Sequence, residues 1–313
     1  MVNGERETAQ ELPRILVCDA IDEEALSIIE DKGWFIDRRF GLDQQALIKI
    51  VPQYNAILVR STTKIDAAVI SAGRHLKAVV RAGSGLDNID VKTAERLGIP
   101  VFNTPEANTT SVAEFTFAMI FSAAQRIPQA HKAFFEDRED EFKTIMIYGK
   151  TLGIVGLGRI GKEVAKTARG FGMKTIAYDP YTTHTQSARF GVKLVDLGTL
   201  LESSDVVTLH TPSTAETRGM FGEKEFNSMK KGAIFINVAR GDLVDEDALI
   251  DAVNSGRIRA GLDVFQNEPN IDPAIRLNTQ IVTTPHIAAY TDDAQKRAGL
   301  EAVKHLIDVF EGK

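Results

Sequence analysis

The sequence predicts an α/β protein built from two doubly wound domains, each with a parallel sheet. Short runs rich in β-branched residues alternate with helical patterns along most of the chain, and a second series of this kind begins near residue 151. A length of 313 residues is sufficient for two domains. Strands and helices that alternate at this spacing form βαβ units, in which helices cover both faces of a parallel sheet.

The first series follows a polar N-terminal segment, residues 1–13, which we expect to be a mobile tail. Its expected strands are Ile15–Cys18, Trp34–Asp37, Ala56–Val59, Lys77–Val80 and Val101–Asn103. Helical patterns cover Asp22–Lys32, Asp43–Val51 and Asp66–Ala72.

The longest apolar helical pattern, Thr109–Arg126, separates the two series. Ser111 and Glu114 have the spacing of a capping box, which predicts that the helix begins near Ser111. The residues that follow are apolar on nearly every side of the helix. We therefore expect this helix to be buried, either inside a domain or against a partner subunit.

The second series has seven expected strands and ends in a long helix. The strands are Thr151–Val155, Lys174–Tyr178, Lys193–Val195, Val206–Leu209, Ala233–Asn237, Ala260–Asp263 and Gln280–Thr283. The final helix, Asp292–Glu311, could run back to cover the first domain.

Composition excludes several classes of protein. The chain has 43 acidic residues against 37 Lys and Arg, and this net charge of −6 argues against a general nucleic-acid binder. A single cysteine, Cys18, excludes an intramolecular disulfide and a Cys-rich metal site, and the histidines lack metal-ligand spacing. No apolar run is long enough for a membrane helix, and the N-terminus lacks a secretory signal. We expect a cytoplasmic protein without a metal, a nucleic-acid partner or a membrane partner.

A glycine motif opens the second series. The strand Thr151–Val155 runs into Gly156, Gly158 and Gly161, in the pattern G-x-G-x-x-G, and a helix follows over Lys162–Phe171. Such glycines allow a tight turn, close approach of the backbone to a pyrophosphate, and close packing of helix on strand. The helix N-terminus then offers N–H groups and a partial positive charge to the anion.

The acidic residue after the next strand indicates the type of dinucleotide. Asp179 lies 18 residues after Gly161, where a carboxylate can accept hydrogen bonds from ribose hydroxyls and repel a 2′-phosphate. No arginine adjoins it to bind that phosphate. The motif therefore predicts a Rossmann domain that binds NAD rather than NADP.

Polar side chains follow the later strands of the second series, at the sheet edge where open α/β sheets bind ligands. Arg240, Glu268 and His286 come from three successive strand ends. Oxidation of a secondary alcohol by hydride transfer needs a base, and the reverse reaction needs an acid; an imidazole can serve both. Glu268 would orient the imidazole, and Arg240 would bind a carboxylate through two hydrogen bonds. These three residues are the candidate catalytic set.

With these residues considered together, the chain resembles the D-2-hydroxyacid dehydrogenase family, and within it the short-form D-3-phosphoglycerate dehydrogenases. The resemblance extends from about Arg14 to the C-terminus. It rests on Leu58–Lys64, Arg81–Asp90, Asn103–Pro105, Asn108–Glu114, the Gly156 loop, Asn237–Gly241, Leu262–Pro269 and Pro285–His286. It implies NAD-dependent oxidation of 3-phospho-D-glycerate to 3-phosphohydroxypyruvate, and the reverse reduction, in serine biosynthesis.

The resemblance also implies a domain arrangement and an assembly. The substrate-binding domain would be flavodoxin-like and comprise residues 14–103 and 287–313. The NAD-binding Rossmann domain, residues 104–286, would be inserted in it. Two chains would form a homodimer largely through the coenzyme domains, which fits the apolar helix after Ser111.

Further site residues follow from matching positions in the family. The expected cofactor contacts are Gly156, Gly158, Arg159, Ile160, Gly161, Asp179, Thr211, Pro212, Val238, Ala239 and Asp263. The expected substrate contacts are Arg60, Ser61, Arg81, Ser84, Gly85 and Asn108. Among these, Arg60 and Ser61 match phosphate-side contacts, and the backbone of Ser84 and Gly85 matches the contact to the substrate carboxylate.

Two departures from the family pattern leave the substrate open. Ala288 and Tyr290 follow the candidate catalytic histidine where the family usually has Gly and Ser. The acidic segment 136–141 replaces one that is basic in many phosphoglycerate enzymes, and Arg138 is its only cation. The alternatives are a glyoxylate or hydroxypyruvate reductase and, in another class, an NAD-sensing scaffold similar to corepressors of this fold.

Overall fold

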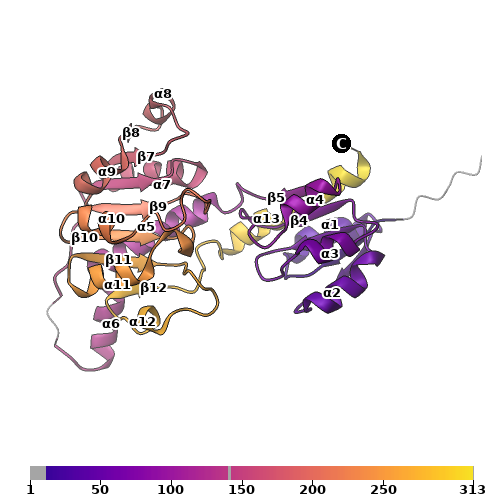
Figure 1. Ribbon diagram of the computed structural model, residues 1–313, viewed down its shortest axis with the longest axis horizontal. Coiled ribbons are helices and arrows are strands. Elements are labelled where there is room, and N and C mark those ends of the chain that lie inside the picture. The colour runs from indigo at the N-terminus through magenta and orange to yellow at the C-terminus, as the bar shows by residue number, and fades with distance from the viewer. Residues whose placement is uncertain (1–11, 140–141, 313) are drawn as a thin grey trace, which may run out of the picture. The chain divides into compact units, whose positions relative to one another are not determined.

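The computed structural model describes residues 12–139 and 142–312. Most of the expected N-terminal tail, and residues 140 and 141 of the acidic segment, lie outside the described residues. The chain forms two compact units, Met1–Asn108 with Thr291–Lys313, and Thr109–Tyr290 (Figure 1). Each unit contains one parallel sheet, so the predicted fold class is confirmed. The unit boundaries fall a few residues after those expected from the sequence.

The first unit has a five-stranded parallel sheet in the order β2-β1-β3-β4-β5. Doubly wound proteins of the flavodoxin type have this order. The strands are β1 (Arg14–Val17), β2 (Phe35–Arg38), β3 (Ala56–Val59), β4 (Ala78–Arg81) and β5 (Val101–Asn103). The helices are α1 (Glu23–Asp31), α2 (Gln44–Ile50), η1 (Val51–Gln53), α3 (Ala67–Ala72), α4 (Val91–Arg96) and α13 (Asp292–Glu311).

Helix α13 completes the first unit although it comes last in the chain. Its residues Ala298, Ala302 and Leu306 are buried in one apolar cluster with residues of β1, β3 and β4. A Cβ on Gly299 would lie only 3.0 Å from the Cβ of Ala25 in α1. The small residues of α13 therefore allow it to pack closely on α1.

The second unit has a seven-stranded parallel sheet in the order β12-β11-β10-β9-β6-β7-β8. The strands are β6 (Thr151–Val155), β7 (Lys174–Tyr178), β8 (Lys193–Leu194), β9 (Val206–Leu209), β10 (Ala233–Asn237), β11 (Ile258–Leu262) and β12 (Ile281–Thr283). The strand order reverses between β6 and β9, as in a Rossmann sheet, and ligands bind at this switch point in open α/β folds.

Helices cover both faces of this second sheet (Figure 1). They are α5 (Thr109–Gln125), α6 (Ile127–Phe135), α7 (Arg159–Gly170), α8 (His184–Ala188), α9 (Leu197–Ser203), α10 (Glu223–Ser228), η2 (Gly241–Leu243), α11 (Glu246–Asn254) and α12 (Pro273–Arg276). In the described part of the chain, no helix has the length and apolar character needed to cross a bilayer.

The first turn of α5 corrects one prediction. The helix begins at Thr109, where the predicted pattern Thr109–Arg126 begins, so Ser111 lies in its first turn rather than before it. The Ser111 hydroxyl donates to the Ala288 carbonyl at 2.8 Å instead of capping the helix. The capping-box prediction at Ser111 is therefore wrong. The expected burial within a domain is confirmed, because Phe117 and Ile120 lie in the core of the second unit.

Candidate active site

The loop after β6 lies at the switch point of the second sheet and leads into α7. Gly156 has φ +92°, and a Cβ at this position would lie 2.7 Å from the carbonyl oxygen of His210, just after β9. A Cβ on Gly161 would lie 2.1 Å from the Gly156 carbonyl oxygen, whereas one on Gly158 would meet nothing within 4 Å. Gly156 and Gly161 thus make the turn and the close packing possible, and Gly158 leaves the outer side of the loop open.

This loop fits a dinucleotide in two further respects. No side chain caps the N-terminus of α7, where Gly158 is the N-cap and Arg159 and Ile160 form the first turn. Such an N-terminus favours an anion. Asp179, after β7, accepts the Leu157 N–H at 2.7 Å and the Tyr181 N–H at 2.8 Å. Its carboxylate is thus fixed beside the glycine loop, with lone pairs left for the hydroxyls of a diol.

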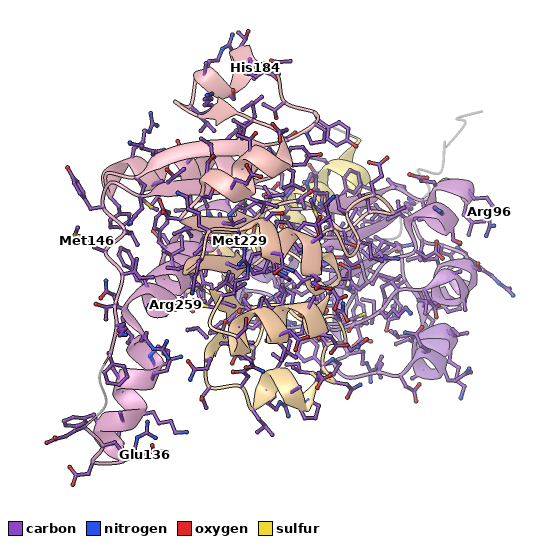
Figure 2. All side chains as sticks on the ribbon, turned by 60° about the vertical axis from the view of Figure 1, so that its left-hand side comes forward. Arg96, Glu136, Met146, His184, Met229 and Arg259 are labelled. Atoms are coloured by element: carbon purple, nitrogen blue, oxygen red, sulfur yellow. The ribbon has the colours of Figure 1, made fainter. Side chains whose placement is uncertain are left out.

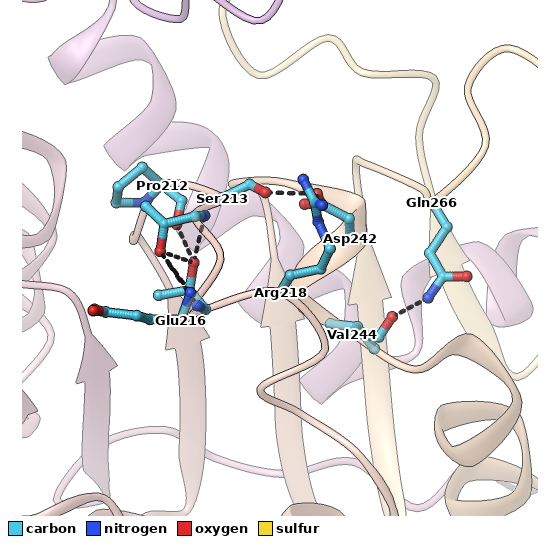
Figure 3. A network of polar contacts seen from close by, with 9 residues as sticks. Pro212, Ser213, Glu216, Arg218, Asp242, Val244 and Gln266 are labelled. Atoms are coloured by element: carbon cyan, nitrogen blue, oxygen red, sulfur yellow. Dashed lines mark hydrogen bonds and ion pairs between the residues drawn. The ribbon is translucent and has the colours of Figure 1, made fainter.

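Three strand-end loops of the second unit are joined by side-chain hydrogen bonds (Figure 3). The Asp242 carboxylate, after β10, accepts from the Ser213 hydroxyl at 2.5 Å and from Arg218 Nε at 3.1 Å, both in the loop after β9. Gln266 Nε2, after β11, donates to the Val244 carbonyl at 2.5 Å. In the β9 loop itself, Thr217 donates to the carbonyl of Pro212, which follows Thr211. The loops that carry Thr211, Arg240 and Glu268 are therefore connected.

His286 and Glu268 form a hydrogen-bonded pair. His286 Nδ1 lies 2.7 Å from Glu268 Oε2, and the other carboxylate oxygen accepts the Phe265 N–H at 2.8 Å. An ionised carboxylate only accepts, so Nδ1 donates and Nε2 is left to exchange a proton. His286 also has φ +56°, a strained value for a residue with a side chain. Strain of this kind is concentrated at functional sites.

The environment of Glu268 keeps it ionised. Burial alone raises the pKa of this carboxyl group. The hydrogen bond and charge of His286, the Phe265 N–H and the charge of Arg240 outweigh burial and hold the pKa of Glu268 below its ordinary value. Glu268 is therefore an anion at neutral pH, as a residue that stabilises an imidazolium must be.

Asp263 holds the loop that carries His286. Its carboxylate is fully buried and accepts from the Thr284 hydroxyl at 2.7 Å and from the N–H groups of Ile287 and Ala288, both at 2.9 Å. Burial raises the pKa of Asp263 in spite of these hydrogen bonds. The hydrogen bonds of Asp263 to Thr284, Ile287 and Ala288 thus reach residues on both sides of His286. Its expected contact with a cofactor stays a prediction.

Arg240 follows β10 in a loop shaped by a buried amide. The Asn237 side chain donates to the Arg240 carbonyl at 2.8 Å and accepts the Ala239 N–H at 3.0 Å, after the buried Val238. Arg240 Nη1 donates to the Ala239 carbonyl at 2.6 Å. A Cβ on the next residue, Gly241, would lie 1.9 Å from the Phe265 carbonyl carbon, so the loops that carry Arg240 and Glu268 touch, and the charge of Arg240 lowers the pKa of Glu268.

In the first unit, Arg60 and Arg81 belong to one polar network at the carboxyl ends of β3 and β4. The Arg60 N–H donates to Asp19 at 2.6 Å, and its guanidinium donates to Gln295 at 2.9 Å. Arg81 Nη1 donates to the Asn88 amide oxygen at 2.7 Å, and Asn88 Nδ2 donates to the Arg60 carbonyl at 2.8 Å. Ser61, next to Arg60, is exposed.

The loop of Ser84 and Gly85 is fixed at the same edge of the first sheet. The Ser84 hydroxyl donates to the Asn108 amide oxygen at 2.6 Å, and Asn103 Nδ2 donates to the Ser84 carbonyl at 2.6 Å. Three of the expected substrate contacts, Ser84, Gly85 and Asn108, therefore lie together at the carboxyl ends of β4 and β5.

Sequence reasoning missed several residues that shape these loops. Asp19 and Asn88 fix the Arg60 loop, and Glu246 and Gln266 fix the Glu268 loop. Asp19 lies two residues after the end of β1, so a search for polar residues at strand ends could have found it. Glu246 carries no such signal, because an acid in the first turn of a helix is common for electrostatic reasons.

Several known proteins resemble the chain. The family model described as "D-isomer specific 2-hydroxyacid dehydrogenase, NAD binding domain" matches residues 117–288. The D-3-phosphoglycerate dehydrogenase of Archaeoglobus fulgidus is 43% identical over 304 residues, which are 96% of this chain and 58% of that protein. The chain thus spans little more than half the length of the curated relatives it matches.

Solved structures resemble the chain over nearly its whole length. The NAD⁺-bound 3-phosphoglycerate dehydrogenase of Entamoeba histolytica superposes with a TM-score of 0.82 at 29% identity, covering 96% of this chain and 97% of that one. A glyoxylate reductase from Paecilomyes thermophila superposes with a TM-score of 0.88 at 30% identity, covering 97% of each chain.

Proposed function

The chain belongs to the D-isomer specific 2-hydroxyacid dehydrogenases, and from that membership we propose that it oxidises 3-phospho-D-glycerate to 3-phosphohydroxypyruvate with NAD and catalyses the reverse reduction. The observation that carries the proposal is the Glu268–His286 pair beside Arg240, on a sheet whose switch point fits a dinucleotide. The names of curated relatives support the choice of a phosphorylated substrate.

In this mechanism His286 moves the proton and Glu268 holds the imidazole. NAD, when bound, supplies the acceptor for the hydride that leaves the α-carbon. His286 Nε2 accepts the proton of the substrate hydroxyl in oxidation and returns it to the carbonyl oxygen in reduction. The Glu268 anion stabilises the imidazolium between these steps. Arg240 binds the substrate carboxylate through its guanidinium, which fixes the orientation of the α-carbon.

The glycine loop and Asp179 would hold NAD. The N–H groups of Arg159 and Ile160, at the start of α7, would bind the pyrophosphate, and Asp179 would accept from the adenosine ribose. Thr211, Pro212, Val238, Ala239 and Asp263 complete the proposed contacts. A phosphate on the 2′-hydroxyl would face the Asp179 anion, so the proposed cofactor is NAD rather than NADP.

The first unit would bind the phosphate and would add contacts to the carboxylate that Arg240 binds. Arg60, Ser61 and Arg81 would bind the phosphate, because a dianion is suited to neighbouring guanidinium groups. The backbone of Ser84 and Gly85 would bind the carboxylate, with Asn108 holding Ser84 in place.

A reductase of glyoxylate or hydroxypyruvate is the second candidate. The glyoxylate reductase structure superposes with a TM-score of 0.88. Tyr290, which stands where the family usually has a serine, is half-exposed close to His286 in the chain. Its phenol could donate to a small unphosphorylated oxo acid.

Kinetics with paired substrates test the phosphate assignment. NADH oxidation is followed with 3-phosphohydroxypyruvate, hydroxypyruvate and glyoxylate as substrates. We expect the largest kcat/KM for the phosphorylated acid. Arg60→Ala should lower that value by about a hundredfold, the loss of one charge-assisted contact, and leave the value for hydroxypyruvate nearly unchanged. Equal losses for both substrates would contradict the assignment and favour the reductase.

We also propose a homodimer formed through the second unit, with α6, Met146 and Tyr148 in the interface. Phe134 and Phe135, at the end of α6, are 80% and 72% exposed, and Met146 and Tyr148 are exposed as well. Figure 2 shows this outer part of the unit, between Glu136 and Met146. Exposed apolar patches of this kind mark protein interfaces, and identical chains most often pair through a two-fold axis.

A cytoplasmic location is proposed on the chemistry of the single cysteine. Cys18 is buried, and burial raises the pKa of its thiol to about 12. A protein that uses no disulfide and keeps its thiol protonated is suited to a reducing compartment.

A further inference from the structure

Glu246 is a buried acid that the proposed mechanism does not use. It lies in the first turn of α11 and is only 8% exposed. Its Oε1 accepts the Gln266 N–H at 2.8 Å, and Gln266 belongs to the loop between β11 and Glu268. Burial of a carboxylate is costly, so its hydrogen bond to this loop requires an explanation.

Two consecutive N–H groups of the loop bind two different carboxylates. Glu268 accepts the Phe265 N–H through Oε1 while its Oε2 contacts His286, and Glu246 accepts the next N–H, that of Gln266. The turn between Phe265 and Glu268 is thus bound by two carboxylates: Glu268 belongs to the turn itself, and Glu246 belongs to helix α11. If the Gln266 backbone moved, the neighbouring Phe265 N–H, which orients the Glu268 carboxylate, would move with it.

Glu246 is itself attached to a rigid part of the second unit. Val244 forms a β-bridge with the buried Phe221, and the Asp245 N–H donates to the Phe221 carbonyl at 2.8 Å. The Gln266 side chain donates to the Val244 carbonyl, which adds a second link between the two loops (Figure 3).

The Arg240 loop packs against the same backbone. A Cβ on Gly241 would lie 1.9 Å from the carbonyl carbon of Phe265, so only glycine allows the two loops to touch there. The position of Phe265 and Gln266 therefore affects both Arg240 and Glu268.

We propose that Glu246 is a positioning residue for the proton transfer: through the Gln266 N–H it holds the 265–268 turn so that Glu268 meets His286. The inference rests on the proposed function, because the proton transfer belongs to it. Burial raises the pKa of Glu246, as do the nearby anions Asp272, Asp247 and Glu268, whereas the hydrogen bond from the Gln266 N–H opposes this rise.

The test compares Glu246→Ala with Glu246→Gln. Both variants remove the charge, but only glutamine keeps an oxygen that can accept the Gln266 N–H. We expect kcat for oxo acid reduction to stay within about twofold of wild type in the glutamine variant and to fall about tenfold in the alanine variant, because a small misplacement of a catalytic group has a large effect. The dissociation constant of NADH should be the same in both.

The pH profile separates positioning from a general loss of stability. Reduction requires ionised Glu268, and the charged groups that face Glu268 are His286, Arg240 and Glu246 itself. Loss of an ordered Phe265 N–H raises the pKa of Glu268, so the acid limb of kcat/KM should lie at higher pH in Glu246→Ala than in Glu246→Gln. The proposal would be overturned if the two variants had equal kcat values and acid limbs of kcat/KM at the same pH.

Glu225→Ala serves as a matched control. Glu225 also sits in a first helical turn of the second unit and accepts a backbone N–H, that of Gly222, but it does not contact the Glu268 loop. The Glu225→Ala variant should have a lower Tm but an unchanged kcat and an unchanged acid limb of kcat/KM. If Glu246→Ala does not fold, Glu246→Asp keeps the charge but shortens the side chain that accepts the Gln266 N–H; it should shift the limb in the same direction, and an unchanged limb would overturn the proposal.

Amide hydrogen exchange distinguishes failure of this inference from failure of the proposed function. The Phe265 and Gln266 amides should exchange faster in Glu246→Ala than in Glu246→Gln, whether or not any oxo acid is reduced. Equal exchange would overturn the positioning role alone. A wild-type protein that binds NADH and reduces no 2-oxo acid would overturn the function alone.

Discussion

Two carboxylates of different burial surround His286, and they have different tasks. Asp263 is fully buried, has a raised pKa and bonds to the chain on both sides of the histidine. Glu268 contacts the imidazole itself and has a lowered pKa. A buried acid suits a fixed structural contact, whereas an ionised acid suits stabilisation of a positive charge that appears during the reaction.

Glu268→Gln tests the charge of this residue. Because the pKa of Glu268 is below its ordinary value, the carboxylate is ionised above about pH 5, and its contribution is lost only as the pH falls through that lowered pKa. The glutamine variant should therefore lose about 10- to 100-fold in kcat at every pH from about 5 to 9, without a new ionisation in that range. A wild-type kcat at pH 7 would show that the charge has no catalytic role.

Asp179→Asn tests the choice of cofactor. The amide oxygen can still accept the Leu157 N–H, but the negative charge that repels a 2′-phosphate is gone. We expect the ratio of NADH to NADPH affinity, measured by fluorescence titration, to fall at least tenfold. An unchanged ratio would mean that another group excludes NADPH.

At the scale of elements, the site is a product of parallel strands that end at a common edge. Several parts of the site follow strands of one sheet, and their convergence could therefore be predicted from strand positions alone. They are the glycine loop, Asp179, Thr211, Arg240 and Asp263. The strands β3, β5, β6, β7, β9 and β10 have the bounds that the sequence predicts. Apolar runs such as those of the fully buried β3 and β10, followed by polar residues, make these bounds predictable.

The role of Ser111 in α5 could not be predicted, because its hydroxyl bonds to a distant residue. The local spacing of Ser111 and Glu114 favours a cap, but Ser111 donates to Ala288, 177 residues away. The same holds for Glu246, whose partner Gln266 comes from another loop. Local patterns therefore predict the strands and the candidate catalytic residues, and tertiary contacts decide which polar groups support them.

Gly161→Ala and Gly158→Ala form a matched pair of tests for the glycine loop. A Cβ at position 161 would lie 2.1 Å from a carbonyl oxygen, whereas at position 158 it would meet no protein atom within 4 Å. Gly161→Ala should lower the free energy of unfolding by about 1 to 3 kcal/mol and weaken NADH binding. Gly158→Ala should weaken NADH binding with an unchanged Tm. If NADH binding survives in both, the loop does not hold the pyrophosphate.

At the scale of the whole molecule, the chain leaves the first unit after Asn108 and returns to it at Thr291. The strand pattern alone does not assign α13 to either unit. Its fit depends on Gly299 and a row of alanines that pack on α1 and the first sheet, which becomes visible only in three dimensions. The net charge of −6 likewise says little about ligands, because the cations Arg60, Arg81 and Arg240 are placed at strand ends.

Replacement of the exposed phenylalanines tests the proposed homodimer. Phe134→Asp with Phe135→Asp introduces two charges into the exposed apolar patch of α6. We expect light scattering to show a dimer for the wild-type chain and a monomer for the double variant, with little change in helical circular dichroism. A dimer that persists in the double variant would place the interface elsewhere, and a monomeric wild type would contradict the proposed assembly.

The proposed proton transfer depends on His286, which Glu268 holds by a hydrogen bond. It is tested by steady-state reduction of 3-phosphohydroxypyruvate by wild type and His286→Ala, with NADH affinity measured on the same samples. The variant should bind NADH within about twofold of wild type and lose about 10²- to 10⁴-fold in kcat. A kcat close to that of the wild type, with NADH bound, would contradict the proposed proton transfer.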